Sequence, residues 1–251
     1  MILKKTLVHI PHSSMEIPEE FLPDFTITPS EVRSELLRMT DRYTDELVDW
    51  SDRLVFPVSR LVCDVERFRD KQIESMTDKG MWVCYTHTSE GKEMKSINTD
   101  QEEEILIRYY DPHHERLAQM AEHRIGVFGR CVIVDVHSFS PDPLPYEPNR
   151  DSSRPQICIG TDTYHTPGIL KSLTAQFFAD RGYSVAIDNP YSGALTPMGM
   201  YKREPRLSAI MIELNRNLYM DTQTGMKTAG FEKLKTCLKD YLAAIEKKGP
   251  P

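Results

Sequence analysis

Apolar residues along the chain follow two patterns, short uninterrupted runs and longer stretches in which they recur every three or four positions. The short runs predict buried strands at 6–10, 53–63 (two segments broken by Pro57), 130–136, 156–160, 183–187 and 209–214. The longer stretches predict helices at 30–50, 100–124, 166–181 and 228–247. Ser30 and Asp100 are the expected N-caps of the first two helices, and Pro112 is expected to kink or interrupt the second.

Strands alternate with helices, and the strands are apolar on both faces. This pattern predicts a single α/β domain over residues 1–251, with a mainly parallel mixed sheet between helical layers in a three-layer sandwich. Two polar stretches, 70–98 and 139–155, are expected to be loops, the first a lid or binding loop. Because ligands of such sheets bind beyond the carboxyl ends of the strands, the polar residues at these ends carry most of the functional information.

Composition narrows the class of protein. Hydrophobic residues make up 39% and charged residues 27% of the chain, so a sizeable core can form. The formal net charge of -7 argues against nucleic acid as a partner. The five cysteines are odd in number and lack zinc-clip spacing, which favours a reducing compartment. With no signal-peptide pattern and no run of ~20 apolar residues, we expect a soluble, cytoplasmic protein that does not bind membranes.

Histidines and carboxylates gather at the expected strand ends. His12 follows the first strand, His137 stands two residues after Asp135, and Glu213 ends the last strand. Two histidines and a carboxylate make an open zinc site, in which the metal lowers the pKa of water to about 7. A second carboxylate then serves as general base, and an arginine such as Arg216 binds a substrate carboxylate. The sequence offers a candidate for each role.

Each of these residues also has an ordinary interpretation. His12 follows a proline in a turn, where a surface hydrogen bond is the simplest explanation. Arg216 is expected on the surface in a weak ion pair with Glu213 unless it binds substrate. His9 is expected to be a packed core histidine, and His113, next to Pro112, to face solvent.

Two aspartates in the first expected helix allow two interpretations. Asp41 and Asp45 are four residues apart and would share one helix face. Their repulsion hints at a nearby cation or hydrogen-bond network, but periodicity alone favours a solvated acidic face.

A set of motifs in this order resembles the N-formylglutamate amidohydrolase family. The motifs are VHIPHSS at 8–14, TDRYTDEL at 40–47, SRLVCDVERFRD at 59–70, DPHHERL at 111–117, VIVDVHSFSP at 132–141, CIGTD at 158–162, NPYSG at 189–193 and IELNRNLYMD at 212–221. The resemblance implies a phosphorylase/hydrolase-like fold of the zinc exopeptidase type. It also implies hydrolysis of the carbon–nitrogen bond of a small N-acyl amino acid, a role in histidine degradation and one zinc ion (Zn2+) per chain.

The resemblance implies roles for individual residues. His12 and His137 become metal ligands, Glu213 the general base and Arg67 the anchor of a substrate carboxylate. Arg216 is implied to bind a second carboxylate or the developing oxyanion, and Asn189 and Ser138 to contact the substrate.

Two positions depart from the related zinc carboxypeptidases. Met15 stands where they have a glutamate ligand, so we assign the acidic ligand to Asp41, with Asp45 and Glu16 as alternatives. Glu66 stands where they have an asparagine, and its negative charge beside Arg67 argues against an acidic substrate. A substrate other than N-formylglutamate is therefore an open alternative.

Three further alternatives remain from the sequence. The first is a peptidase or cell-wall amidase of the same fold, and the second is a binding protein that has kept the fold without the metal. The third is a serine hydrolase built on Ser13 or Ser138, which the lack of a Gly-x-Ser-x-Gly motif disfavours. The sequence leaves the oligomeric state open.

Overall fold

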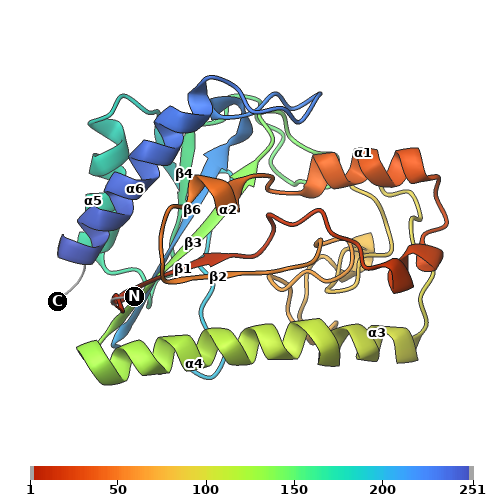
Figure 1. Ribbon diagram of the computed structural model, residues 1–251, viewed down its shortest axis with the longest axis horizontal. Helices are drawn as coiled ribbons and strands as arrows, with labels where there is room; N and C mark the ends of the chain where they lie inside the picture. Colours follow the sequence, from red (N-terminus) through yellow and green to blue (C-terminus); the bar gives the residue numbers. More distant parts are fainter. Residues whose placement is uncertain (1–2, 249–251) are drawn as a thin grey trace.

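A computed structural model describes residues 3–248, and a six-stranded sheet runs through its centre in the order β2-β1-β3-β6-β4-β5 (Figure 1). The strands are β1 (Thr6–Ile10), β2 (Arg53–Val55), β3 (Cys131–Phe139), β4 (Ile157–Gly160), β5 (Val185–Ile187) and β6 (Leu207–Asn215). Neighbouring strands are parallel except β4 and β6, which are antiparallel. The predicted mainly parallel mixed sheet is confirmed.

Helices cover both faces of this sheet (Figure 1). On one face lie α2 (Thr44–Leu47), α5 (Gly168–Ala179) and α6 (Gly230–Lys248), and on the other lies α4 (Asp111–Phe128). Val134 packs in one buried cluster with Tyr241 of α6, whereas Ile133 packs in another with Leu117 of α4. Successive residues of β3 therefore enter opposite cores, as the period of two requires. This explains the uninterrupted apolar run and confirms the three-layer sandwich.

The prediction of one continuous helix over 30–50 is wrong, because the helix is interrupted in the middle of this range. The structure has α1 (Pro29–Met39), a break, and then the short α2. Thr28, not Ser30, is the N-cap and forms a capping box with Glu31. The break arises because the Asp41 backbone N–H donates to the His12 carbonyl at 2.9 Å, which draws the chain out of the helix. Asp41 therefore does not share a helix face with Asp45.

Two other predicted elements differ in detail. Only β2 forms within 53–63, since the stretch from Ser59 is a turn in which Cys63 N–H donates to the Ser59 carbonyl. The predicted long helix is α3 (Thr99–Ile105), a π-helical turn (Leu106–Tyr110) and α4, with Asn98 rather than Asp100 as N-cap. The π-turn ends at Tyr110, just before the first turn of α4 that contains Pro112. An interruption was expected there because proline cannot supply the regular helical hydrogen bond.

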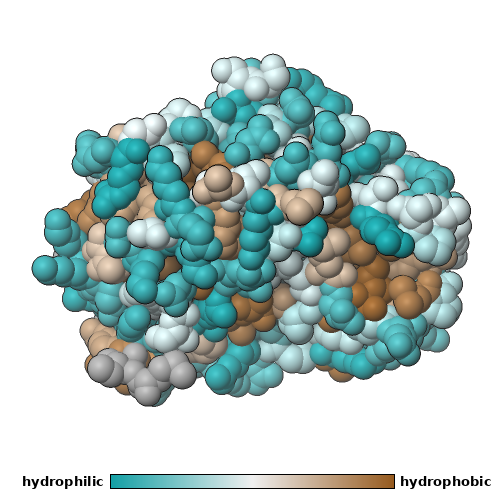
Figure 2. Space-filling model, turned by 45° about the horizontal axis from the view of Figure 1, so that its top comes forward, coloured by the Kyte–Doolittle hydropathy of each residue, from teal (hydrophilic) through white to brown (hydrophobic). Residues whose placement is uncertain are grey.

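Figure 2 shows that hydrophilic residues cover most of one face, while hydrophobic residues gather in smaller areas between them. No helix among residues 3–248 is long and apolar enough to cross a membrane.

Candidate metal centre and active site

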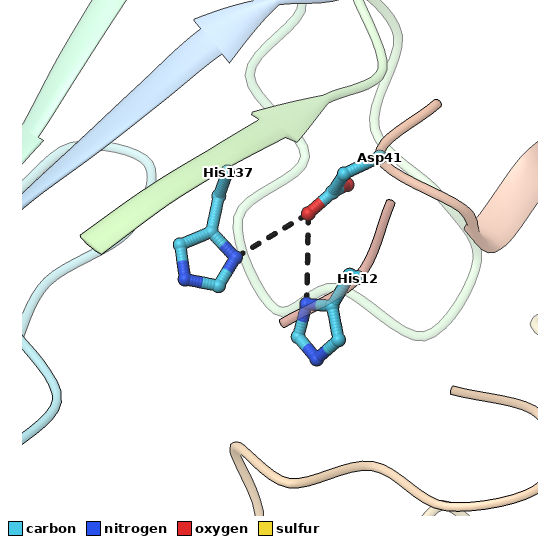
Figure 3. A group of neighbouring side chains, drawn as sticks. All are labelled: His12, Asp41 and His137. Carbon is cyan, nitrogen blue, oxygen red and sulfur yellow. Dashed lines mark ion pairs between the residues drawn. The ribbon is translucent and has the colours of Figure 1, made fainter. Parts of the chain in front are cut away.

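Three buried side chains converge beyond the carboxyl ends of β1 and β3 (Figure 3). His12 follows β1, His137 lies on β3, and Asp41 comes from the break between α1 and α2. Asp41 Oδ2 lies 3.5 Å from His12 Nδ1 and 3.3 Å from His137 Nδ1. The break that the sequence did not predict thus brings the carboxylate to the two histidines.

This arrangement fits a divalent metal such as zinc. Bonds of 2.0–2.2 Å in a tetrahedral zinc site separate neighbouring ligand atoms by about 3.3 Å. The two Asp41 distances are close to this value, and His12 Nδ1 is buried without a hydrogen-bond partner in the protein. Three protein ligands also leave a fourth position open for water or substrate. Of the alternative acidic ligands, Glu16 is exposed and Asp45 half-buried, and neither belongs to this group.

A second carboxylate fixes the orientation of His12. Its Nε2 donates to Asp64 Oδ1 at 2.8 Å, which leaves the Nδ1 lone pair of the neutral ring facing Asp41. Asp64 also accepts from Arg60 Nη2 at 2.7 Å and from the Tyr85 hydroxyl at 2.6 Å. Burial alone would raise the pKa of Asp64, but Arg60 and His12 hold it well below its usual range. Buried carboxylates behind ligand histidines are a recurrent feature of metal sites.

Ser138 and Arg216 fix Asp41. The Ser138 hydroxyl and Arg216 Nη2 both donate to Asp41 Oδ1, at 3.2 and 3.1 Å. Arg216 Nε donates to Ser138 Oγ at 3.1 Å, and its Nη1 to the Arg38 carbonyl at 2.6 Å. Arg216 is thus buried rather than on the surface, and each of its nitrogens has a protein partner. Burial alone would raise the pKa of Asp41, but the neighbouring His12 and His137 rings and the charge of Arg216 hold it well below its usual range.

A chain of histidines and carboxylates lies behind His137. His137 Nε2 lies 3.1 Å from Asp135 Oδ2, and Asp135 Oδ1 lies 2.8 Å from His9 Nδ1. His9 Nε2 in turn lies 2.8 Å from His113 Nε2. His9 is buried as expected, but the expectation that His113 faces solvent is wrong, because its ring extends from α4 to the sheet and meets His9.

Glu213 stands beside His137 on the neighbouring strand, since the register of β3 and β6 pairs these two residues. It is buried, and its Oε2 has no hydrogen-bond partner in the protein. Burial raises the pKa of Glu213 to about 8, with Asp41 and Asp135 adding to the rise and His137 opposing it. The carboxyl group is therefore suited to exchange a proton near neutral pH.

The side chains of the site that line one cavity of about 350 Å³ are His12, Asp41, His137, Ser138, Glu213 and Arg216. Arg60 and Arg67 also line it, and both point to Asp64, at 2.7 and 3.5 Å. Arg67 Nη2 donates to the Tyr85 hydroxyl at 3.2 Å, and its Nε lacks a hydrogen-bond partner. The family motif in the sequence pointed to Arg67 but not to Arg60, whose only signal was its position four residues before Asp64.

One predicted site residue lies elsewhere. Asn189 is exposed and does not line the cavity, and its Oδ1 accepts from Asn149 Nδ2 at 2.9 Å. Tyr191 and Ser192 of the same motif line the cavity instead.

Comparison with known proteins identifies the family and the fold. The sequence pattern of the N-formylglutamate amidohydrolase family matches residues 4–220. The crystal structure of N-formylglutamate amidohydrolase from Ralstonia eutropha JMP134 is similar at 20% identity and a TM-score of 0.84, covering 97% of this chain and 93% of that chain. A gene product of Agrobacterium tumefaciens is similar at 17% identity and a TM-score of 0.65, covering 97% and 92%. At these identities the two structures show a shared fold.

No functionally curated protein matches the chain in sequence. The family match nevertheless extends over most of the chain, from β1 to the segment after β6. The chain therefore belongs to the N-formylglutamate amidohydrolase family, whose members are hydrolases of carbon–nitrogen bonds other than peptide bonds.

Proposed function

We propose that this protein is a metal-dependent hydrolase that cleaves the amide bond of a small N-acyl amino acid. The observation that carries the proposal is the convergence of His12, Asp41 and His137, with Glu213 on the same cavity. The cavity volume of about 350 Å³ lies within the range of small-ligand sites.

His12, Asp41 and His137 would hold the metal, and zinc suits two imidazoles and a carboxylate. A metal held there would polarise the amide carbonyl and lower the pKa of water, so that the water could lose a proton and act as the nucleophile. Asp64 keeps His12 in the tautomer whose Nδ1 faces the site. Arg216 and Ser138 hold Asp41 in place, so we assign them to the metal ligand rather than to the substrate.

Glu213 supplies the proton transfer. Its carboxylate takes the proton of the attacking water and passes it to the nitrogen of the leaving amine. Glu213 lines the cavity, and its Oε2 has no hydrogen-bond partner in the protein that would compete for the proton. A cation at the neighbouring ligands would lower its pKa from about 8 and favour the basic form.

Arg67 binds the carboxylate of the substrate, with Arg60 beside it as a second donor. Both guanidinium groups line the cavity while sharing the single charge of Asp64, so the pair retains an excess positive charge. Charge-assisted hydrogen bonds of this kind fix a carboxylate in position. Burial and the charge of Asp135 raise the pKa of Glu66, on the same wall, well above its usual range. In either protonation state Glu66 offers no positive charge to a second carboxylate, which favours a substrate with one carboxylate over N-formylglutamate, which has two.

Hydrolysis of a panel of N-formyl and N-acetyl amino acids, with and without zinc, tests the proposal. We expect zinc-dependent release of the amino acid, strongly reduced in Glu213→Gln with metal binding retained. Glu46→Gln, a change of an exposed glutamate, is the matched control and should behave as wild type. If Glu213→Gln and Glu46→Gln turn over equally fast, the assigned base is wrong. If N-formylglutamate is the best substrate, a place in histidine degradation follows and our argument from Glu66 fails.

A further inference from the structure

The side of His137 that faces away from Asp41 carries a second group of ligand-type atoms. Figure 3 shows the two ring nitrogens of His137 pointing in different directions, with Nδ1 toward Asp41. On the Nε2 side lie Asp135, His9 and Glu66. Asp135 and His9 are fully buried, and the Glu66 side chain is 18% exposed.

The distances within this group have the spacing of metal ligands. His9 Nδ1 lies 2.8 Å from Asp135 Oδ1 and 3.4 Å from Glu66 Oε1. His137 Nε2 lies 3.1 Å from Asp135 Oδ2 and 3.9 Å from Glu66 Oε1. These values lie around the ligand-to-ligand separation of about 3.3 Å in a tetrahedral zinc site. His9, Glu66 and Asp135 thus form a group whose ligand atoms lie within 4.8 Å of one another, and His137 Nε2 lies beside it.

Three atoms of the group are buried without a hydrogen-bond partner in the protein, namely Asp135 Oδ2, Glu66 Oε1 and His137 Nε2. Asp135 Oδ2 and His137 Nε2 are close to each other but are not aligned for a hydrogen bond. Among residues 3–248, no lysine or arginine forms an ion pair with either carboxylate. Buried carboxylate oxygens without donors are costly. Asp135 Oδ1 has His9 Nδ1 at 2.8 Å, but Asp135 Oδ2 and Glu66 Oε1 have no donor, so these two oxygens call for a positive charge between them.

The contrast with His12 supports this interpretation. Behind His12, Nε2 makes an aligned hydrogen bond to Asp64, whose other oxygen accepts from Arg60 and Tyr85. That carboxylate has its donors and needs no metal. Behind His137, Asp135 has a single partner, His9 Nδ1 on Oδ1, while its Oδ2 and the facing His137 Nε2 have none.

We propose that His9, Glu66, Asp135 and His137 Nε2 form a second divalent-cation site, with zinc as the ion that this donor set suits. His113 orients His9 through the contact between their Nε2 atoms. When both sites are filled, His137 coordinates one cation through each ring nitrogen, and the proton of its Nε2 leaves to solvent. The inference shares His137 with the proposed function and rests on it to that extent.

Zinc titration of the metal-free protein, by calorimetry and by elemental analysis after gel filtration, tests the second site. We expect about two zinc ions per chain in wild type and about one in both His9→Gln and Asp41→Asn. If wild type and His9→Gln each bind about one, the second site is refuted and the four residues are only a hydrogen-bonded shell. If Asp41→Asn binds as many zinc ions as wild type, it is the first site, and with it the proposed function, that fails.

Two further variants distinguish the loss of a zinc site from misfolding of the protein. His165→Gln changes another buried histidine, whose Nδ1 and Nε2 both have partners, Leu207 O and Lys202 N, each at 2.9 Å. This matched control should still bind about two zinc ions. If His9→Gln does not fold, Glu66→Gln decides, because it keeps the shape of a partly exposed side chain. A loss of tenfold or more in the affinity of one zinc ion supports the second site, and unchanged affinity overturns it.

Discussion

Replacement of Glu213 by glutamine should make the metal-free protein more stable at high pH. The pKa of Glu213 rises from an ordinary value of 4.5 to about 8 through burial, so the folded state favours the protonated form. The stability that this form provides is complete below about pH 4.5 and is lost as the pH rises through about 8. Each pKa step of one corresponds to about 1.4 kcal/mol, so complete ionisation costs about 5 kcal/mol. Glutamine keeps the shape of the protonated acid and does not ionise.

The assay is urea unfolding of wild type and Glu213→Gln in a chelating buffer across the pH range in which the native protein persists. The difference in the free energy of unfolding should be small near pH 4 and approach about 5 kcal/mol in favour of the variant near pH 9. Added zinc should reduce this difference, because a neighbouring cation stabilises the carboxylate. Glu46→Gln should show no such pH-dependent gain. Parallel stability curves for wild type and Glu213→Gln would refute the raised pKa and the buried environment that causes it.

Three further substitutions test other contacts. Arg67→Met should raise KM by about 10- to 100-fold for substrates with a carboxylate, since a charged hydrogen bond contributes about 1.5–3 kcal/mol. KM for an uncharged amide should not change, and equal effects on both substrates would show that Arg67 does not bind the substrate carboxylate. Arg216→Met should weaken zinc binding by about 10- to 100-fold in chelator competition, because it loosens Asp41, and an unchanged affinity would contradict that role. Thr28→Ala should lower the free energy of urea unfolding by about 1 kcal/mol through loss of the capping box, and no loss would show that this cap adds nothing.

Much of the sheet followed from the sequence because its strands are apolar on both faces. Because the carboxyl ends of parallel strands meet at one edge of a sheet, His137 and Glu213 were expected near each other, and they are direct neighbours on β3 and β6. The single domain stays a prediction.

The position of Asp41 could not be predicted by periodicity. The apolar stripe continues through 30–50, but a backbone hydrogen bond to His12, which follows β1, ends α1 and brings Asp41 next to His12 and His137. The family resemblance selected Asp41 without explaining how it arrives there.

The supporting contacts were also beyond the sequence. Nothing local indicates that Arg216 and Ser138 would hold Asp41, or that Asp64, Arg60 and Tyr85 would fix His12, because these contacts join separate elements. Ser138 is held between Asp41 and Arg216, which gives no support to a nucleophilic serine.

The most direct test of the metal-dependent mechanism is the zinc dependence of amide hydrolysis by protein from which a chelator has removed the metal. Zinc should restore turnover of an N-acyl amino acid in wild type but not in Asp41→Asn. The two control variants, Glu46→Gln and His165→Gln, should recover turnover as wild type does. Full turnover by metal-free wild type without added zinc would contradict this mechanism. Recovery of Asp41→Asn to the wild-type rate after zinc addition would also contradict it.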